Sequence, residues 1–243
     1  MNIIALIPAR LSSTRFNRKL MMDLCGKSVI TRTYNAVVNT NLFTSTIVVT
    51  QDLEIYQEII SNNGKSLLIE KEYSSGTDRI AEACIDIEAD VIINIQGDEP
   101  FINKPSLETL INIFTSDIKK KINYASLMKE VSNDKEINDP NNVKVSVDDN
   151  NYALNFSRKP IYSITNLDNN ACYKHIGVYG YRKDALISLS KLPQTELELD
   201  ERIEALRIIE SGCKIKMAEV KTESIGIDTD EDLKKAIDIW KNK

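Results

Sequence analysis

Short apolar runs alternate with amphipathic segments over the first hundred residues of the chain. The apolar runs have the length and composition of buried strands and cover residues 3–8, 45–50, 65–70 and 89–95. The segments between them repeat apolar residues at helical spacing and cover residues 28–39, 53–64 and 76–87. This alternation predicts an α/β fold, with a mostly parallel sheet and helices on both of its faces.

The rhythm changes after Pro105, which is well placed in the first turn of a helix over 106–114. Four closely spaced strand candidates follow at 123–128, 143–148, 152–157 and 173–182. The polar runs between them, 131–142 and 163–172, are typical of loops. We therefore expect a mixed or antiparallel extension of the sheet. The rest of the chain predicts a helix over 198–211, a strand over 214–220 and a helix over 230–243 that Thr229 opens.

Composition and charge narrow the class of protein. We interpret the 243 residues as one soluble globular domain over 1–243. The formal net charge of -5 disfavours broad binding of nucleic acid. No apolar run approaches the length of a membrane-spanning helix, and the first residues indicate a strand rather than a signal peptide. The four cysteines never form a CxxC pair, which favours free thiols in a reducing cytoplasm.

Polar clusters follow several of the predicted strands. In open parallel sheets ligands bind outside the carboxyl ends of the strands, so these clusters are candidates for one shared site. The loop 8–19, "PARLSSTRFNRK", combines fixed cations with hydroxyl groups, as binding of a triphosphate requires. It lacks the spacing of a P-loop and of a dinucleotide fingerprint. The loop alone is equally compatible with a solvated basic surface.

Two further clusters carry groups suited to a nucleotide and a metal. Residues 74–79, "SSGTDR", open a helix and offer free N–H groups, although helix capping suffices to explain Asp78. In "QGDEP", Gly97 lets the chain turn and Asp98 presents a carboxylate at the tip of a strand. Asp228 ends another apolar stretch, where it is equally well explained as a residue next to a helix cap. Together, Asp98 and Asp228 could hold Mg²⁺, with water and phosphate oxygens completing its coordination.

Two more candidates have structural explanations of their own. His175, the one histidine, shares a strand face with Tyr179, and a lone histidine in a strand is usually structural. Glu198, Glu201 and Glu204 share one face of the predicted helix, and such a stripe is most often a solvated surface.

The ordered set of motifs resembles the 3-deoxy-manno-octulosonate (Kdo) cytidylyltransferases, or CMP-Kdo synthetases, over essentially the whole chain. The motifs are "IPARLSSTRFNRKL", "SSGTDRIAEA", "NIQGDEPFI", "DPNNVKV", "YALNFSR", "YKHIGVYGYR", "IEALR" and "GIDTDEDL". The resemblance implies a nucleotidyltransferase fold with a Rossmann-like sheet and a sugar-binding and dimerisation subregion around 120–215. It also implies a Mg²⁺-dependent transfer of CMP from CTP to Kdo, with release of pyrophosphate, by a cytoplasmic homodimer that supplies lipopolysaccharide synthesis.

The resemblance assigns roles to single residues. The implied nucleotide-binding residues are Arg10, Ser13, Arg15, Lys19, Ser75, Gly76, Arg79 and Asp98. The implied catalytic residues are Arg10, Lys19, Asp98 and Asp228, of which Asp98 and Asp228 are the metal ligands. The implied contacts to the sugar acid are Gln96, Arg158, His175, Tyr179 and Glu204. Arg158 is a natural partner for the carboxylate of the sugar acid.

Three departures from the family's pattern leave alternatives open. Asn17 and Arg18 replace a Pro-Gly pair, Ala205 replaces a glutamine, and the segment 159–163 differs from the usual one. These differences lie near expected ligand positions, so a related sugar acid such as 8-amino-Kdo is an alternative substrate. A non-catalytic nucleotide or sugar binding protein is a further alternative, and a nucleic-acid-binding module is disfavoured by the acidic charge.

Overall fold

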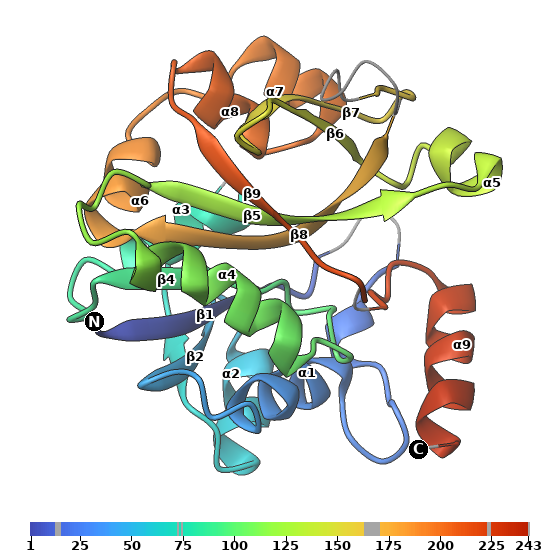
Figure 1. Ribbon diagram of the computed structural model, residues 1–243. Coiled ribbons are helices and arrows are strands. Elements are labelled where there is room, and N and C mark those ends of the chain that lie inside the picture. The colour runs from blue at the N-terminus through green and yellow to red at the C-terminus, as the bar shows by residue number, and fades with distance from the viewer. Residues whose placement is uncertain (13–15, 72, 74, 163–170, 223–224, 243) are drawn as a thin grey trace. The chain divides into compact units, whose positions relative to one another are not determined.

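The computed structural model describes residues 1–12, 16–71, 73, 75–162, 171–222 and 225–242 (Figure 1). The chain forms two compact units, one of Met1–Leu107 with Ser224–Lys243 and one of Glu108–Glu223. The second unit contains the subregion 120–215 that the sequence sets apart, and the organisation as a single domain stays a prediction.

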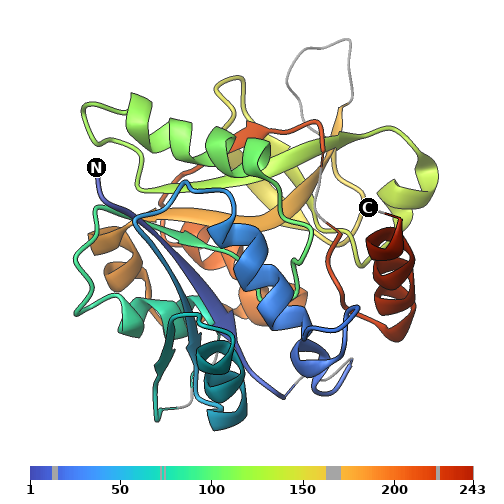
Figure 2. The same cartoon turned by 90° about the horizontal axis from the view of Figure 1, so that it is seen from below.

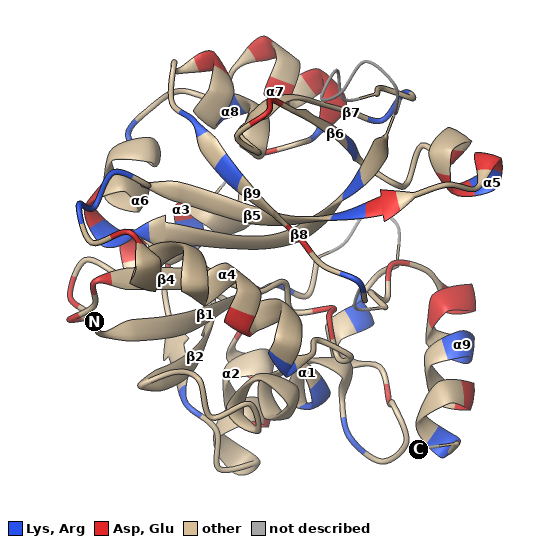
Figure 3. Ribbon diagram, in the orientation of Figure 1, with Lys and Arg blue, Asp and Glu red and all other residues tan. Residues whose placement is uncertain are grey.

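The first unit is built on four parallel strands. They lie in the order β3 (Ser66–Leu68), β2 (Ser45–Thr50), β1 (Ile3–Ala9) and β4 (Val91–Asn94). All residues of β1 and β4 are buried, and both strands are tan in Figure 3, the colour of residues other than Lys, Arg, Asp and Glu. A parallel strand that is covered on both faces needs apolar residues at every position, which is why these runs do not alternate. The predicted parallel α/β core is therefore confirmed.

Hydroxyl side chains cap three helices of the first unit, among them Thr229, which the sequence predicts. This unit contains the helices α1 (Val29–Val38), α2 (Leu53–Ser61), α3 (Gly76–Ala83) and α9 (Asp230–Lys241), with the short 3₁₀ helix η1 (Lys19–Met21) after the first loop. The hydroxyl oxygens of Ser28, Ser75 and Thr229 accept hydrogen bonds from the first turns of α1, α3 and α9. Figure 2 shows α9 beside the loop that leads into α1, and the Arg32 guanidinium lies 4.3 Å from the Trp240 ring centre.

The second unit carries the mixed part of the fold. β5 (Tyr124–Val131) pairs antiparallel with β8 (Cys172–Arg182) and parallel with β9 (Ile215–Glu219). β6 (Lys144–Val147) pairs antiparallel with both β7 (Ala153–Ser157) and β8. The expected mixed or antiparallel extension is confirmed, and it is mixed because β5 and β9 are parallel. Helix α4 (Lys104–Ser116) spans the boundary between the units in the sequence.

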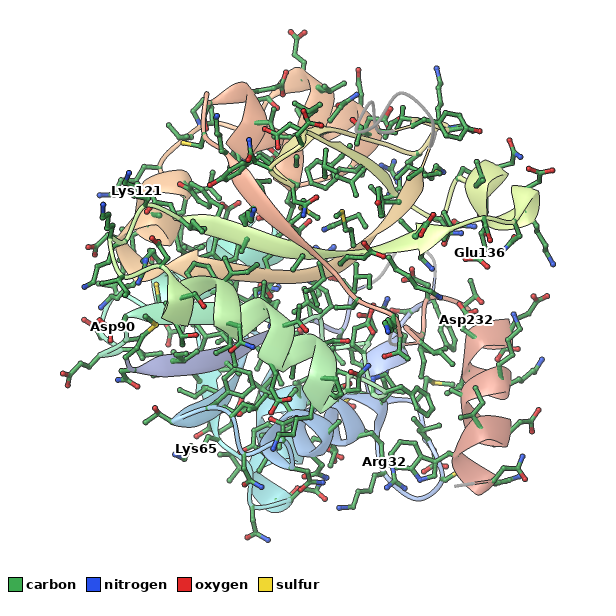
Figure 4. All side chains as sticks on the ribbon, viewed as in Figure 1. Arg32, Lys65, Asp90, Lys121, Glu136 and Asp232 are labelled. Atoms are coloured by element: carbon green, nitrogen blue, oxygen red, sulfur yellow. The ribbon has the colours of Figure 1, made fainter. Side chains whose placement is uncertain are left out.

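The helices of the second unit differ from the prediction. Helices α5 (Asp134–Asn138), which carries Glu136 in Figure 4, and α6 (Lys183–Leu189) were not predicted, because each is too short to repeat a helical pattern. The expected helix over 198–211 is two helices, α7 (Glu196–Glu201) and α8 (Ala205–Glu210). Arg202 interrupts them with a φ of 55°, a left-handed conformation that ends α7. Among the described residues, no helix has the length and apolar character needed to cross a membrane.

Candidate active site

The polar clusters of the first unit lie at the carboxyl edge of its sheet. Leu6 of β1 pairs with Asn94 of β4 and Ala9 pairs with Thr50 of β2, so the loops after these three strands leave the sheet at one edge. The first residue of α3, Gly76, approaches the same edge, because a Cβ there would lie 3.2 Å from Pro8 Cγ. The expectation that the clusters gather at one edge is confirmed for the described residues.

Lys19 connects the two carboxylates proposed as metal ligands. Its Nζ donates hydrogen bonds to the Asp98 carboxylate and to Asp228 Oδ1, the latter at 2.8 Å. The Lys19 and Asp98 side chains are 14% and 21% exposed to solvent. Burial lowers the pKa of Lys19, but the charges of Asp98 and Asp228 outweigh burial and raise it overall. The ammonium group therefore stays charged at neutral pH.

Close packing brings Asp228 to Asp98. A Cβ on Gly226 would lie 3.1 Å from Glu99 Oε1, and the Ile227 N–H donates to the Asp98 carbonyl over 2.9 Å. Thr229 and Asp232 then form a capping box that starts α9, with Asp232 on its first turn in Figure 4. The segment before α9 thus delivers Asp228 to the edge of the sheet.

The chain turns at Gly97 as predicted, with the Glu99 N–H donating to the Gln96 carbonyl over 3.2 Å, and close packing gives a second reason for the glycine. Its φ is not positive, but a Cβ there would lie 3.1 Å from Ile30 Cδ1 and 3.2 Å from the Pro8 carbonyl oxygen. Glycine is needed because the loop after β4 packs directly on β1 and α1. The Gly97 carbonyl also accepts a hydrogen bond of 2.8 Å from the buried Thr33 hydroxyl. These contacts fix the main chain beside Asp98.

The carboxylates fit a hard divalent cation. Asp98 and Asp228 both reach one cationic nitrogen, so a cation can contact both at that point. Within the described ranges no group of three or more His, Cys, Asp or Glu side chains could hold a metal alone. Mg²⁺ commonly takes one or two carboxylates and completes its shell with water and phosphate oxygens.

The first loop has its ends fixed. The Arg18 N–H donates to the Leu11 carbonyl over 3.1 Å, and the Leu11 N–H donates to Asp52 Oδ2 over 2.8 Å. Arg10 lies exposed directly after β1. Arg18, where the family pattern has glycine, adopts a φ of 57° and pairs with Glu54 on the surface. Ser13 and Arg15 lie outside the described residues.

Three of the implied nucleotide-binding residues, Ser75, Gly76 and Arg79, lie at the start of α3. The Ser75 hydroxyl accepts from the Asp78 N–H over 3.1 Å and donates to the Asp78 carboxylate over 2.9 Å, so Ser75 is the cap of α3 and the capping explanation for Asp78 holds. Arg79 is buried, and its Nη2 donates to Gln51 Oε1 over 3.2 Å. Gln51, which follows β2, was not among the predicted site residues, since a single polar residue after a strand carries no distinctive signal.

His175 and Tyr179 lie together in the second unit. Their ring centres are 5.2 Å apart, and the Phe156 ring lies 5.0 Å from that of His175. His175 Nε2 hydrogen-bonds with Ser126 Oγ at 2.9 Å. Burial lowers the pKa of His175 to about 3. Burial, followed by the charges of Tyr181 and Glu204, raises the pKa of Tyr179, which indicates that Glu204 also lies near this cluster.

We expect His175 to make the protein less stable in acid. In the unfolded chain His175 has its ordinary pKa of 6.5 and becomes protonated below that pH. In the folded protein it stays neutral down to about pH 3. The free energy of unfolding should therefore fall as the pH drops below 6.5, by up to about 1.4 kcal/mol for each pH unit from this group. Urea unfolding of the wild type and of His175→Gln at pH 7 and pH 4.5 measures this. An equal loss of stability in both proteins between the two pH values would contradict it.

The remaining candidates for sugar binding are Arg158 and Glu204 in the second unit and Gln96 in the first. Arg158, at the end of β7, donates from Nε to the Glu201 carbonyl over 2.8 Å and from Nη1 to the Pro140 carbonyl over 2.9 Å. Glu204 precedes α8 and is half-buried. Gln96 belongs to the first unit, where it is half-buried after β4.

The interpretation of Glu198, Glu201 and Glu204 as a solvated stripe is wrong. Glu198 is buried, with 3% of its side chain exposed, and both of its carboxylate oxygens accept from Arg207, at 2.6 and 2.8 Å. Because the chain bends at Arg202, Glu201 and Glu204 do not share one helix.

Comparisons with known proteins agree on one family. A family model described as cytidylyltransferase matches residues 4–217. The 3-deoxy-manno-octulosonate cytidylyltransferase of Flavobacterium johnsoniae is 51% identical over 97% of each chain. That of Fusobacterium nucleatum is 42% identical over 99% of this chain and 98% of its own. The solved structure of a CMP:2-keto-3-deoxy-manno-octonic acid synthetase complexed with CTP is 33% identical, with a TM-score of 0.91 over 100% of this chain and 99% of the other.

Proposed function

Because the chain belongs to the 3-deoxy-manno-octulosonate cytidylyltransferases, we propose that it transfers CMP from CTP to the anomeric hydroxyl of Kdo. The hydroxyl oxygen forms a bond to the α-phosphorus, the bond from that phosphorus to pyrophosphate breaks in line, and the hydroxyl proton is released. The products are CMP-Kdo and pyrophosphate. The similarity in sequence over almost the full length and the structural match carry this assignment.

The contacts of Lys19 with Asp98 and Asp228 support a role in the chemistry. A displacement at phosphorus requires positioning of the reactants and neutralisation of the phosphate charges. Lys19 and Arg10 provide cations for the triphosphate at the carboxyl edge of the sheet, and the N-terminus of α3 lies at the same edge. The groups proposed to bind the triphosphate thus come from one edge of the sheet.

Asp98 and Asp228 would hold Mg²⁺ in this proposal. When bound, the ion would neutralise phosphate charge and polarise the phosphoryl group. Lys19 contacts the same two carboxylates, so it would share them with the ion and could offer its ammonium group to the phosphates. The chain's own contribution is to hold two carboxylates and one ammonium within reach of the same substrate.

Release of pyrophosphate tests the proposed function. Pyrophosphate release is measured in mixtures of purified protein, Mg²⁺ and CTP that contain Kdo, 8-amino-Kdo or no sugar. Mixtures with UTP or ATP in place of CTP are the nucleotide controls. We expect release with CTP and Kdo alone. Release with 8-amino-Kdo but not with Kdo would show that the substrate is the amino sugar acid. Binding of CTP without release in any mixture would show that the protein binds the nucleotide and does not catalyse the transfer.

Ala205, one of the departures from the family pattern, is buried in α8 and contributes no polar group to a sugar.

We further propose a cytoplasmic homodimer that supplies CMP-Kdo for lipopolysaccharide synthesis. The four cysteines are all free thiols, which fits a reducing compartment. Large apolar side chains of the second unit are exposed and are available for contacts with a second copy: Leu154 of β7 and Leu197 and Leu199 of α7 are 50%, 40% and 55% exposed. Light scattering should give twice the mass of the chain, and a monomer at micromolar concentration would contradict the dimer.

A further inference from the structure

Lys144 is a fully buried lysine in the second unit. It lies in β6, all of whose residues are buried, and its own exposure is 0%. Its Nζ donates hydrogen bonds to three main-chain carbonyls: those of Asp139, at 2.9 Å, Asn142, at 2.6 Å, and Arg158. In the described part of the chain, this ammonium group forms no hydrogen bond with a carboxylate. Burial lowers the pKa of Lys144, as expected for a cation away from water.

A buried ammonium group such as that of Lys144 lowers the stability of the fold unless its partners compensate for the lost hydration. A buried cation loses its hydration, and an apolar side chain of similar volume often serves a protein interior equally well or better. The three carbonyls compensate Lys144 only because the segment 139–142 and the end of β7 are held around it. The contacts therefore join two segments that are distant in the sequence.

The side chain of Arg158 closes this arrangement into a ring. Arg158 Nη1 donates back to the segment that Lys144 holds, at the Pro140 carbonyl, over 2.9 Å. Arg158 Nε donates to the carbonyl of Glu201 at the end of α7, and the Arg158 N–H donates to Glu201 Oε2 over 3.1 Å. Lys144 thus fixes both the main chain of Arg158 and the loop that orients its guanidinium group.

The choice of acceptors leaves the guanidinium charge available. Within the described ranges the Arg158 side chain hydrogen-bonds only to carbonyl oxygens, and its Nη2 has no protein acceptor. Neutral carbonyls orient the guanidinium group and leave its charge in place. A carboxylate acceptor would cancel that charge. The nearby Glu201 carboxylate accepts from the main-chain N–H of Arg158 and not from its guanidinium group. The oriented guanidinium group therefore keeps Nη2 for the carboxylate of a ligand.

We propose that Lys144 is a positioning residue for the sugar acid, acting through Arg158. It holds the segment 139–142 and the Arg158 main chain in one geometry, and the guanidinium group then meets the substrate carboxylate without further ordering. This inference rests on the proposed function, since it takes Arg158 as the carboxylate ligand. Lys144 itself does not touch the substrate.

The test compares Lys144→Met with Val147→Ala. Methionine keeps most of the volume and removes the ammonium group. Val147 is buried at the other end of β6, so its truncation weakens the same strand away from Arg158. We expect Lys144→Met to raise the KM for Kdo by about 10- to 100-fold and to leave the KM for CTP within about twofold. Val147→Ala should leave both KM values near those of the wild type. Equal kinetic changes in the two folded variants would reduce Lys144 to a structural residue.

A double variant separates action through Arg158 from an independent effect. In Arg158→Ala, the added Lys144→Met substitution should raise the KM for Kdo by less than about twofold, because the group that it positions is gone. Additive losses would overturn the proposal. If Lys144→Met does not fold, Lys144→Gln, which keeps an amide donor, replaces it in both comparisons.

Hydrogen exchange tests the same inference independently of turnover. Lys144→Met should exchange faster than Val147→Ala at 139–142 and 157–159, with no difference between them in β9. Unchanged exchange at these segments would overturn the positioning role even in an active enzyme. If the wild type forms no product with any sugar acid, the proposed function fails on that assay. The exchange result, together with direct binding of Kdo to wild type and Lys144→Met, then still decides the role of Lys144.

Discussion

Asp98→Asn is expected to lower kcat by about a thousandfold or more while the protein remains folded. Asparagine has the size of aspartate, and its carbonyl oxygen can still accept a hydrogen bond from Lys19. What is lost is one of the two negative charges at Lys19 Nζ, and with it a charged oxygen ligand for a divalent cation. Initial rates of pyrophosphate release over a range of Mg²⁺ concentrations measure the loss, and a thermal melt checks the fold.

Asp90→Asn provides a matched control. Asp90 directly precedes β4 and accepts a hydrogen bond from the Asn2 N–H over 2.7 Å, whereas Asp98 follows the same strand at its other end. Both substitutions remove one carboxylate charge beside β4. Asp90→Asn should keep kcat within about twofold, since surface charges distant from a site have small effects. A kcat for Asp98→Asn within tenfold of the control would exclude Asp98 as a metal ligand in the reaction.

The strands of the first unit and the position of its site could be predicted from the sequence. The runs in β1 and β4 are apolar at every position, a pattern that only burial on both faces explains. The polar residues that follow them then had to meet at the carboxyl edge. The pairing of Asp98 with Asp228 could not be derived in this way. It depends on the fit of Gly226 against Glu99 and on the hydrogen bond from Ile227 to Asp98, which are tertiary contacts.

The second unit was harder to predict, because its charged residues are used against their usual preference. Lysine and glutamate normally lie at the surface, so the sequence pattern assigned Glu198 to a solvated stripe and drew no attention to Lys144. In the structure each is buried with several partners that lie in other elements. The break at Arg202 was missed for a related reason: helical periodicity continues across it, and no glycine or proline marks the turn.

Arg207→Met is expected to destabilise the protein by about 3 to 5 kcal/mol. Arg207 donates to both oxygens of Glu198 in a bidentate pair, and 3% of each side chain is exposed. Methionine fills much of the space but leaves a buried carboxylate without its cation. The Gln194 amide and the Thr195 N–H, at 3.2 and 3.4 Å, supply only neutral donors to that carboxylate. The shift of the urea unfolding curve at pH 7 measures the change.

The double variant Glu198→Gln with Arg207→Met shows whether the cost arises from the stranded charge. A neutral glutamine can still accept from the Thr195 N–H, so the double variant should recover at least about 1 to 2 kcal/mol relative to Arg207→Met. We also expect the double variant to bind the sugar acid better than Arg207→Met does. The pair joins α7 to α8 across the turn that carries Glu204, a proposed contact to the sugar acid. A loss of under about 1 kcal/mol in Arg207→Met would mean that Glu198 finds water or another donor when Arg207 is removed. The pair would then not hold the two helices together.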